Sequence, residues 1–143
     1  MVSDASSGAI DKVGVISCSG EEMAEGTISR LATRQVLESL RPGTTVTLCL
    51  PLFAAGNEGE RNFARTHPMI TIDGCEKQCA KWATEKYGER PVRRALVVSD
   101  ILGEEGAACR RSLRDHGEAD QEAARVVAEK IAREVDSVLA EER

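Results

Sequence analysis

Four short runs of apolar and β-branched residues recur along the chain, and they constrain its fold more than any other feature. They are the segments 13–17, 44–50, 69–72 and 94–99. Each has the length and composition of a largely buried β-strand. Parallel neighbours need crossover connections, and the segments between the runs are long enough to hold helices. The pattern therefore predicts an α/β fold with an open, mainly parallel four-stranded sheet.

Helical spacing of apolar residues places helices between these runs. One helix is expected over about 27–40 and another over about 75–87. Shorter helices are expected at 60–66 and around 107–115, in segments whose glycines otherwise indicate loops.

The segment 120–141 has the most regular helical pattern of the chain. One stripe along it carries only apolar residues: Ala124, Val127, Ile131, Val135 and Val138. We expect this C-terminal helix to pack on the sheet. Residues 1–11 are mostly small and polar, which predicts a flexible tail. At 143 residues, the chain fits a single three-layer domain with helices flanking both faces of the sheet.

Right-handed crossover connections on the two faces of the sheet predict the strand order 2-1-3-4. In this order the second and third strands lie on opposite sides of the first, which creates a switch point between the first and third strands. Open α/β sheets bind their ligands at such a switch point, outside the carboxyl ends of the strands. We therefore expect the functional site at that edge.

Composition argues against several kinds of partner. The formal net charge is −5 and the isoelectric point is near 5.2, which disfavours nucleic-acid binding through general electrostatics. No apolar segment has the length of a membrane span or the form of a signal peptide. We therefore expect a cytoplasmic protein without a membrane partner. The glycine-rich sequences that commonly cradle phosphates do not occur.

Cysteine is the residue type that most clearly indicates a site. The chain has five cysteines. In a reducing compartment, cysteines serve more often as metal ligands, reactive thiols or core residues than as disulfides. Cys18, Cys49 and Cys75 lie at or near the carboxyl ends of three neighbouring predicted strands, and Cys79 follows four positions after Cys75. We expect these four thiols to meet at one place. Cys109 has no partner in this arrangement.

The stretch Asp73-Gly74-Cys75 marks the change from the third strand to the helix that follows. An Asp-Gly pair provides the turn, which accounts for Asp73 without a chemical role. A helix that starts at Cys75 places Cys79 on the same face one turn later, and the partial positive charge of its N-terminus favours thiolates. Four thiolates suit tetrahedral zinc, with Zn–S distances of about 2.3 Å, or an iron–sulfur cluster. For Cys49, burial as a small apolar side chain is an equally good explanation.

Together these residues resemble the DGC-domain family. The resemblance covers about residues 13–100 and rests on three motifs: Cys18-Ser19-Gly20, Cys49-Leu50-Pro51, and Asp73-Gly74-Cys75 with Cys79. It implies a small intracellular protein of no established activity, with four cysteines proposed to bind zinc. In this chain those four are Cys18, Cys49, Cys75 and Cys79. Cys109 falls outside the family pattern.

Three functional hypotheses follow. In the first, the four thiolates bind a metal ion, with zinc the favoured metal. The role is then metal handling or sensing, and it can include a protein partner that receives the metal. In the second, the protein is a thiol enzyme or sulfur carrier, in which Cys75 forms a persulfide or mixed disulfide and Cys79 or Cys18 resolves it. In the third, it is an iron–sulfur protein. The residues alone leave open whether the protein is an enzyme.

Overall fold

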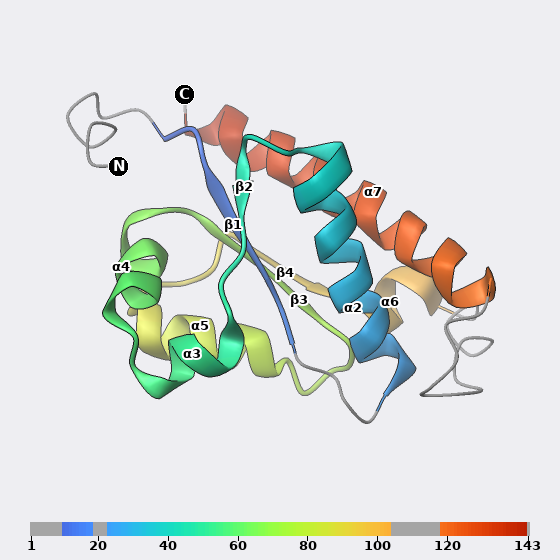
Figure 1. The fold of residues 1–143 in the computed structure, drawn as a ribbon, viewed down its shortest axis with the longest axis horizontal. Helices are drawn as coiled ribbons and strands as arrows, with labels where there is room; N and C mark the ends of the chain where they lie inside the picture. Colours follow the sequence, from blue (N-terminus) through green and yellow to red (C-terminus); the bar gives the residue numbers. More distant parts are fainter. Residues whose placement is uncertain (1–9, 19–22, 104–117, 143) are drawn as a thin grey trace.

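The computed structural model describes residues 10–18, 23–103 and 118–142. In this part of the chain a parallel four-stranded sheet lies between two layers of helices (Figure 1). The strand order is β2-β1-β3-β4, and every neighbouring pair is parallel. The predicted α/β class and the predicted order 2-1-3-4 are both confirmed.

The two central strands pair over four residues each. β1 is Val13–Ser17 and β3 is Met69–Asp73. Their register runs from Gly14 opposite Met69 to Ser17 opposite Ile72. β3 is buried along its whole length, so the residues that follow it start from a rigid point in the fold.

The outer strands are β2, Thr45–Val46, and β4, Arg94–Val97. The predicted strand over 44–50 is wrong beyond Val46, because the chain enters a helix at Leu50. Pro51 lies in the first turn of that helix, where its fixed φ and missing N–H group are both favourable. Cys49 therefore precedes a helix and does not lie in a strand.

Helices make up most of the remaining described chain. α2 runs directly into a π-helical segment, η1, and the bounds are α2 Ala24–Gln35, η1 Val36–Leu40, α3 Leu50–Ala55, α4 Glu58–Thr66, α5 Cys79–Gly88, α6 Val98–Leu102 and α7 Glu118–Glu141. The helix predicted at 60–66 is confirmed as α4, whereas α3 was not predicted. The helix expected around 107–115 lies outside the described residues.

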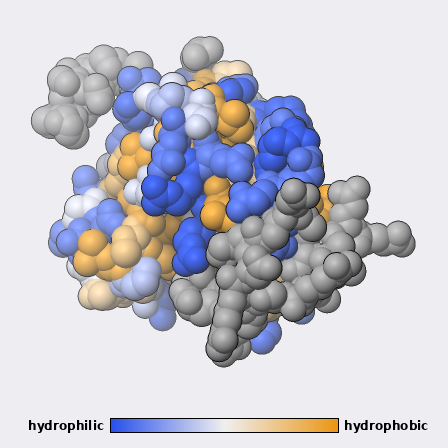
Figure 2. Space-filling view, turned by 45° about the vertical axis from the view of Figure 1, so that its right-hand side comes forward, coloured by the Kyte–Doolittle hydropathy of each residue, from blue (hydrophilic) through white to orange (hydrophobic). Residues whose placement is uncertain are grey.

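The surface is mixed in character. Figure 2 shows hydrophilic and hydrophobic side chains interspersed on the face turned to the viewer. Large exposed hydrophobic side chains in the described part of the chain are Met23, Leu52 and Trp82, of which Trp82 is 74% exposed. No helix within the described ranges combines the length and the apolar character that a membrane span requires.

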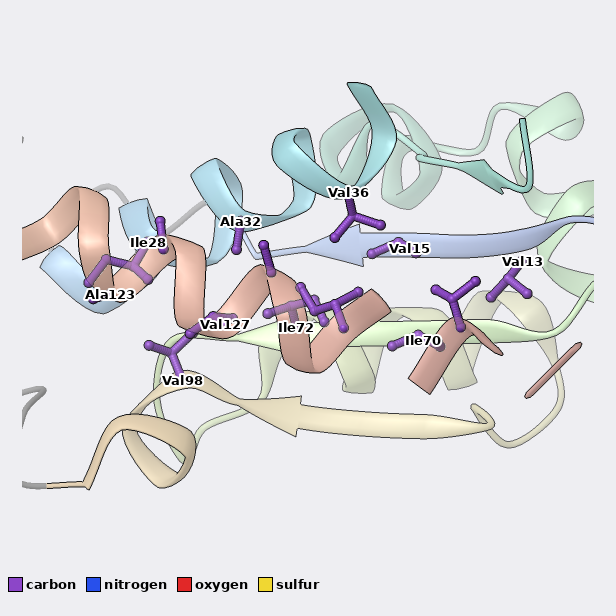
Figure 3. Close-up of a cluster of buried hydrophobic side chains, with 14 of the residues drawn as sticks. Val13, Val15, Ile28, Ala32, Val36, Ile70, Ile72, Val98, Ala123 and Val127 are labelled. Carbon is purple, nitrogen blue, oxygen red and sulfur yellow. The ribbon is translucent and has the colours of Figure 1, made fainter. Parts of the chain in front are cut away.

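The larger hydrophobic core lies between the sheet and the pair formed by α2 and α7 (Figure 3). Side chains alternate between the two faces of a strand, so every second residue of β1 and β3 points to this core. Residues from α2 and α7 complete it, and its fully buried members include Val15, Ile28, Ile72, Val127 and Ile131. The C-terminal helix therefore packs on the sheet as predicted.

A smaller core lies on the opposite face of the sheet. Ile16 and Met69 reach it from β1 and β3, and Phe53 of α3 and Ala64 of α4 pack against them. Phe53 is fully buried, although it belongs to a helix of only six residues. The two cores give the three-layer arrangement: α2 with α7, the sheet, and then α3 with α4 and α5.

Charged side chains also hold α7 against β4. Arg94 donates from Nε to Glu134 Oε1 at 2.8 Å and from Nη2 to Glu141 Oε2 at 2.6 Å. Arg93 pairs with Glu141 and Glu142. Partly exposed ion pairs contribute little to stability individually. We therefore infer that these pairs orient α7, and that its packing in the apolar core stabilises it.

Replacing Ile131 with Ala tests the packing of α7. The side chain is fully buried, so its truncation should lower the free energy of unfolding by about 2–5 kcal/mol. Urea denaturation followed by circular dichroism measures this change. Arg133→Ala on the exposed side of the same helix is the control and should change stability by less than about 0.5 kcal/mol. Equal effects of the two variants would contradict the assigned face of α7.

Candidate functional site

Asp73 ends β3 and holds the start of the next helix. Its side chain is 1% exposed. Oδ1 accepts a hydrogen bond from the Ala80 amide at 2.7 Å, and Oδ2 accepts one from the Lys81 amide at 3.2 Å. Burial raises the pKa of Asp73, while these two amides and the Lys81 charge act in the opposite direction. Asp73 therefore caps α5 across seven positions, a role beyond the predicted turn.

Gly74 allows two backbones to approach closely. A Cβ atom at this position would lie 2.7 Å from the Gly26 nitrogen and 2.9 Å from the Glu25 carbonyl carbon, both in the first turn of α2. Separations this short do not occur between real Cβ atoms and backbone. The Gly74 carbonyl also accepts a hydrogen bond from the Ser99 amide at 3.3 Å. The residue must be glycine for α2 to pack against the end of β3.

Cys75 lies in a turn, and the helix predicted from residue 75 is wrong at its start. The Gln78 amide donates to the Cys75 carbonyl at 3.1 Å, and Gln78 has a left-handed conformation with φ 53°. α5 then begins at Cys79. The cap from Asp73 reaches Ala80, which sets the helix start four residues later than predicted. Cys75 and Cys79 therefore do not share a helical face.

Cys18 follows β1 directly and contacts the turn after β3. Its amide donates to the Ile72 carbonyl at 3.0 Å. Its Sγ accepts a hydrogen bond from the Gly74 amide at 3.4 Å and lies 3.6 Å from Ser29 Oγ. The half-buried thiol thus connects the ends of the two central strands.

The electrostatic surroundings of Cys18 are mixed. Burial is the largest influence and raises the pKa of the thiol; the charges of Asp73 and Cys79 also raise it. The hydrogen bond between Cys18 and Ser29 and the one from the Gly74 amide act in the opposite direction.

Cys49 is exposed and precedes α3. Its amide donates to Glu60 Oε1 at 2.8 Å, which ties the start of α3 to α4. Cys18 and Cys49 both border a cleft of roughly 630 Å³ between α2 and the segment 47–51. The other lining residues are Ser17, Arg30, Thr33, Arg34, Leu37, Glu38, Thr47, Leu48, Leu50 and Pro51.

The four predicted cysteines all follow strand ends or begin a helix near the carboxyl edge of the sheet, and all four are free thiols. They are not gathered into a closed centre. Within residues 10–18, 23–103 and 118–142, no three His, Cys, Asp or Glu side chains are grouped closely enough to hold one metal ion. Cys109 lies outside the described residues. The role of Cys18, Cys49, Cys75 and Cys79 as metal ligands stays a prediction.

Ser29 is a site residue that the sequence reasoning missed. It is fully buried on α2, where its hydroxyl donates to the Gly26 carbonyl at 2.6 Å, and it faces the Cys18 thiol. Its signal in the sequence is weak: it is a polar residue beside Ile28, and Glu25 and Thr33, one helical turn away on either side, are polar as well. Serine also occurs in helices without such a contact, because its hydroxyl can bond the preceding turn, so this signal alone would not have identified it.

The fold and the site define a small α/β protein in which the four cysteines of the described residues lie along the carboxyl edge of a parallel sheet. The chain belongs to the DGC domain family, whose family model matches residues 14–138. This match extends along α7, well beyond the region of about 13–100 that carries the resemblance in the sequence. Searches of curated proteins and of solved structures give no match.

Gly74→Ala tests the contact between the β3 turn and α2. The added Cβ would meet backbone atoms that cannot rotate away, so the free energy of unfolding should fall by about 1–3 kcal/mol. Thermal or urea denaturation measures the loss. Gly59→Ala is the control: its Cβ would lie 3.3 Å from Asn57 Oδ1, a tight contact with the end of a side chain and not with backbone, and alanine favours a helix over glycine by up to about 1 kcal/mol. Unchanged stability of the Gly74 variant would contradict the close approach.

Proposed function

We propose that the protein binds a metal ion, zinc in the first instance, through the thiolates of Cys18, Cys49, Cys75 and Cys79. We place this activity in the cytoplasm, where thiols stay reduced. The donor set fits the metal in kind, since four thiolates are a preferred tetrahedral ligand set for zinc. The proposed role of the protein is metal handling or sensing, with a protein partner that receives the metal.

One observation supports this proposal above the others. Cys18 Sγ lies 3.4 Å from the Gly74 amide, so a thiol at the end of β1 contacts the turn that carries Cys75. Backbone N–H groups directed at sulfur are well suited to a thiolate, because charge-assisted hydrogen bonds are stronger than neutral ones. Two of the proposed ligands are thus brought to one edge by the pairing of the two central strands.

The open arrangement of the thiols supports a handling role over a purely structural one. Structural zinc sites are closed by their four ligands, whereas Cys49 and Cys79 are exposed. Cys49 stands between β2 and α3, and Cys75 lies in a turn between β3 and α5. Binding of an ion would draw these connecting segments together, so the ion would be enclosed when bound and accessible during its transfer.

A sulfur carrier is the second candidate, and the exposure of Cys79 favours it. In this reaction a thiolate takes the outer sulfur of a donor persulfide, and the donor leaves as its own thiolate. The sequence places Cys75 in this role, with Cys79 or Cys18 as the resolving thiol. Because Cys75 is half-buried in a turn and Cys79 is exposed at the start of α5, Cys79 is the better candidate for the accepting thiol.

Zinc titration of anaerobically purified, metal-free protein tests the proposal. We expect about one zinc per chain and joint protection of four thiols from alkylation. Cys75→Ser and Cys79→Ser should each weaken zinc binding by more than the roughly 10–100-fold seen when groups behind the ligands are changed. Competition with a chromogenic chelator measures the affinity.

Cys109→Ser is the control, since it makes the same chemical change outside the proposed ligand set. It should leave zinc affinity unchanged. Absence of zinc binding, with one fast-reacting thiol at Cys79, would contradict the metal proposal and favour the sulfur carrier. A coloured anaerobic preparation containing iron and inorganic sulfide would favour an iron–sulfur cluster.

A further inference from the structure

α5 leaves one of its faces without a partner in the described part of the chain. Ala80, Thr84 and Gly88 are buried against the body of the protein. An open groove of roughly 470 Å³ runs along the other side, here called the α5 groove, and it is lined by Ala54, Lys77, Cys79, Trp82, Ala83, Lys86 and Tyr87.

The α5 groove has an aromatic floor that the fold holds in place. Tyr87 meets Phe53 edge to face with ring centroids 5.9 Å apart, and the Arg61 guanidinium lies 4.1 Å from the centre of its ring. Trp82 is 74% exposed beside it. A large indole left in water is unfavourable by itself, whereas tryptophan and tyrosine are the residues that dominate binding interfaces.

The charges of the α5 groove are all positive, although the chain as a whole carries −5. Lys77 and Lys86 form no ion pair with any described carboxylate, and Lys86 lies 5.4 Å from the Tyr87 ring centre. Glu76 is exposed in the preceding turn and does not line the groove.

The neighbouring carboxylates of α4 and α5 already have partners. Glu85 pairs with Lys81, and Glu60 accepts the Cys49 amide. Glu58 and Glu89 both pair with Arg65. The two lysines of the groove are therefore available to charges that another molecule supplies.

We propose that the α5 groove docks an acidic segment of a partner protein, with an apolar side chain of that segment against Trp82 and Tyr87 and its carboxylates at Lys77 and Lys86. Nucleic acids and anionic membranes need broad basic surfaces, which an overall charge of −5 opposes. A short segment with a few carboxylates matches two lysines that line an aromatic groove. Local complementarity of this kind directs and aligns a partner.

The groove brings such a partner next to Cys79, which lines it. A docked segment would therefore lie beside a thiol of the proposed metal site. The docking proposal rests on the groove alone and does not require that the protein bind a metal. The experiment below is done with a chelator present, so that failure of docking and failure of metal binding are separate results.

Intrinsic fluorescence gives a direct readout, because Trp82 is the sole tryptophan of the chain. The probe is a short synthetic peptide of alternating glutamate and leucine, titrated into the full-length protein. We expect a blue shift of the emission as the indole leaves water, and weaker binding at higher salt. The double variant K77E/K86E should weaken binding on the order of tenfold, because attraction becomes like-charge repulsion.

Three controls define the surface and the ligand. R133E on α7, on the other face of the sheet, makes a charge reversal of the same kind at a single position and should leave binding unchanged. Peptides of alternating glutamate and serine, or of lysine and leucine, should bind at least about tenfold more weakly. No response to the glutamate–leucine peptide, equal binding by K77E/K86E, or tighter binding to phosphatidylserine vesicles or single-stranded DNA would each overturn the proposal.

Discussion

The contact between the turn after β3 and the first turn of α2 is the constraint on which the candidate site depends. Gly74 lies so close to Glu25 and Gly26 that no side chain fits between the two backbones. The residue before it, Asp73, caps α5 through two amides. One buried dipeptide therefore positions a helix from each layer, and it holds the Cys18 thiol at the Gly74 amide.

This constraint explains why the Asp-Gly-Cys motif can serve a thiol site without containing a preassembled one. Asp73 and Gly74 have structural roles in the interior, whereas Cys75 lies in a turn outside it. Cys18 is fixed by both central strands, whereas Cys49 and Cys79 stand at the exposed starts of α3 and α5. This combination of a fixed thiol with exposed thiols is the basis of the proposed role in metal handling.

The order of the sheet could be predicted because buried, β-branched runs such as those of β1 and β3 have few other roles, and crossover rules limit their arrangement. Local boundaries could not be predicted where tertiary contacts decide them. The start of α5 depends on a carboxylate seven residues before Ala80, and the pattern of apolar residues around Cys75 carries no trace of it. β2 is shorter than predicted because the chain leaves the sheet after Val46 and enters α3 at Leu50, with Pro51 in the first turn of that helix. The pattern located the thiols at one edge, but distances between sulfurs depend on loop conformations that no periodicity encodes.

The most direct test of the proposed ligand set is X-ray absorption spectroscopy at the zinc edge on protein loaded with one equivalent of zinc. The account predicts a first shell of four sulfur atoms at about 2.3 Å, supplied by Cys18, Cys49, Cys75 and Cys79. A shell dominated by oxygen or nitrogen, or one with two or fewer sulfur atoms, would contradict it.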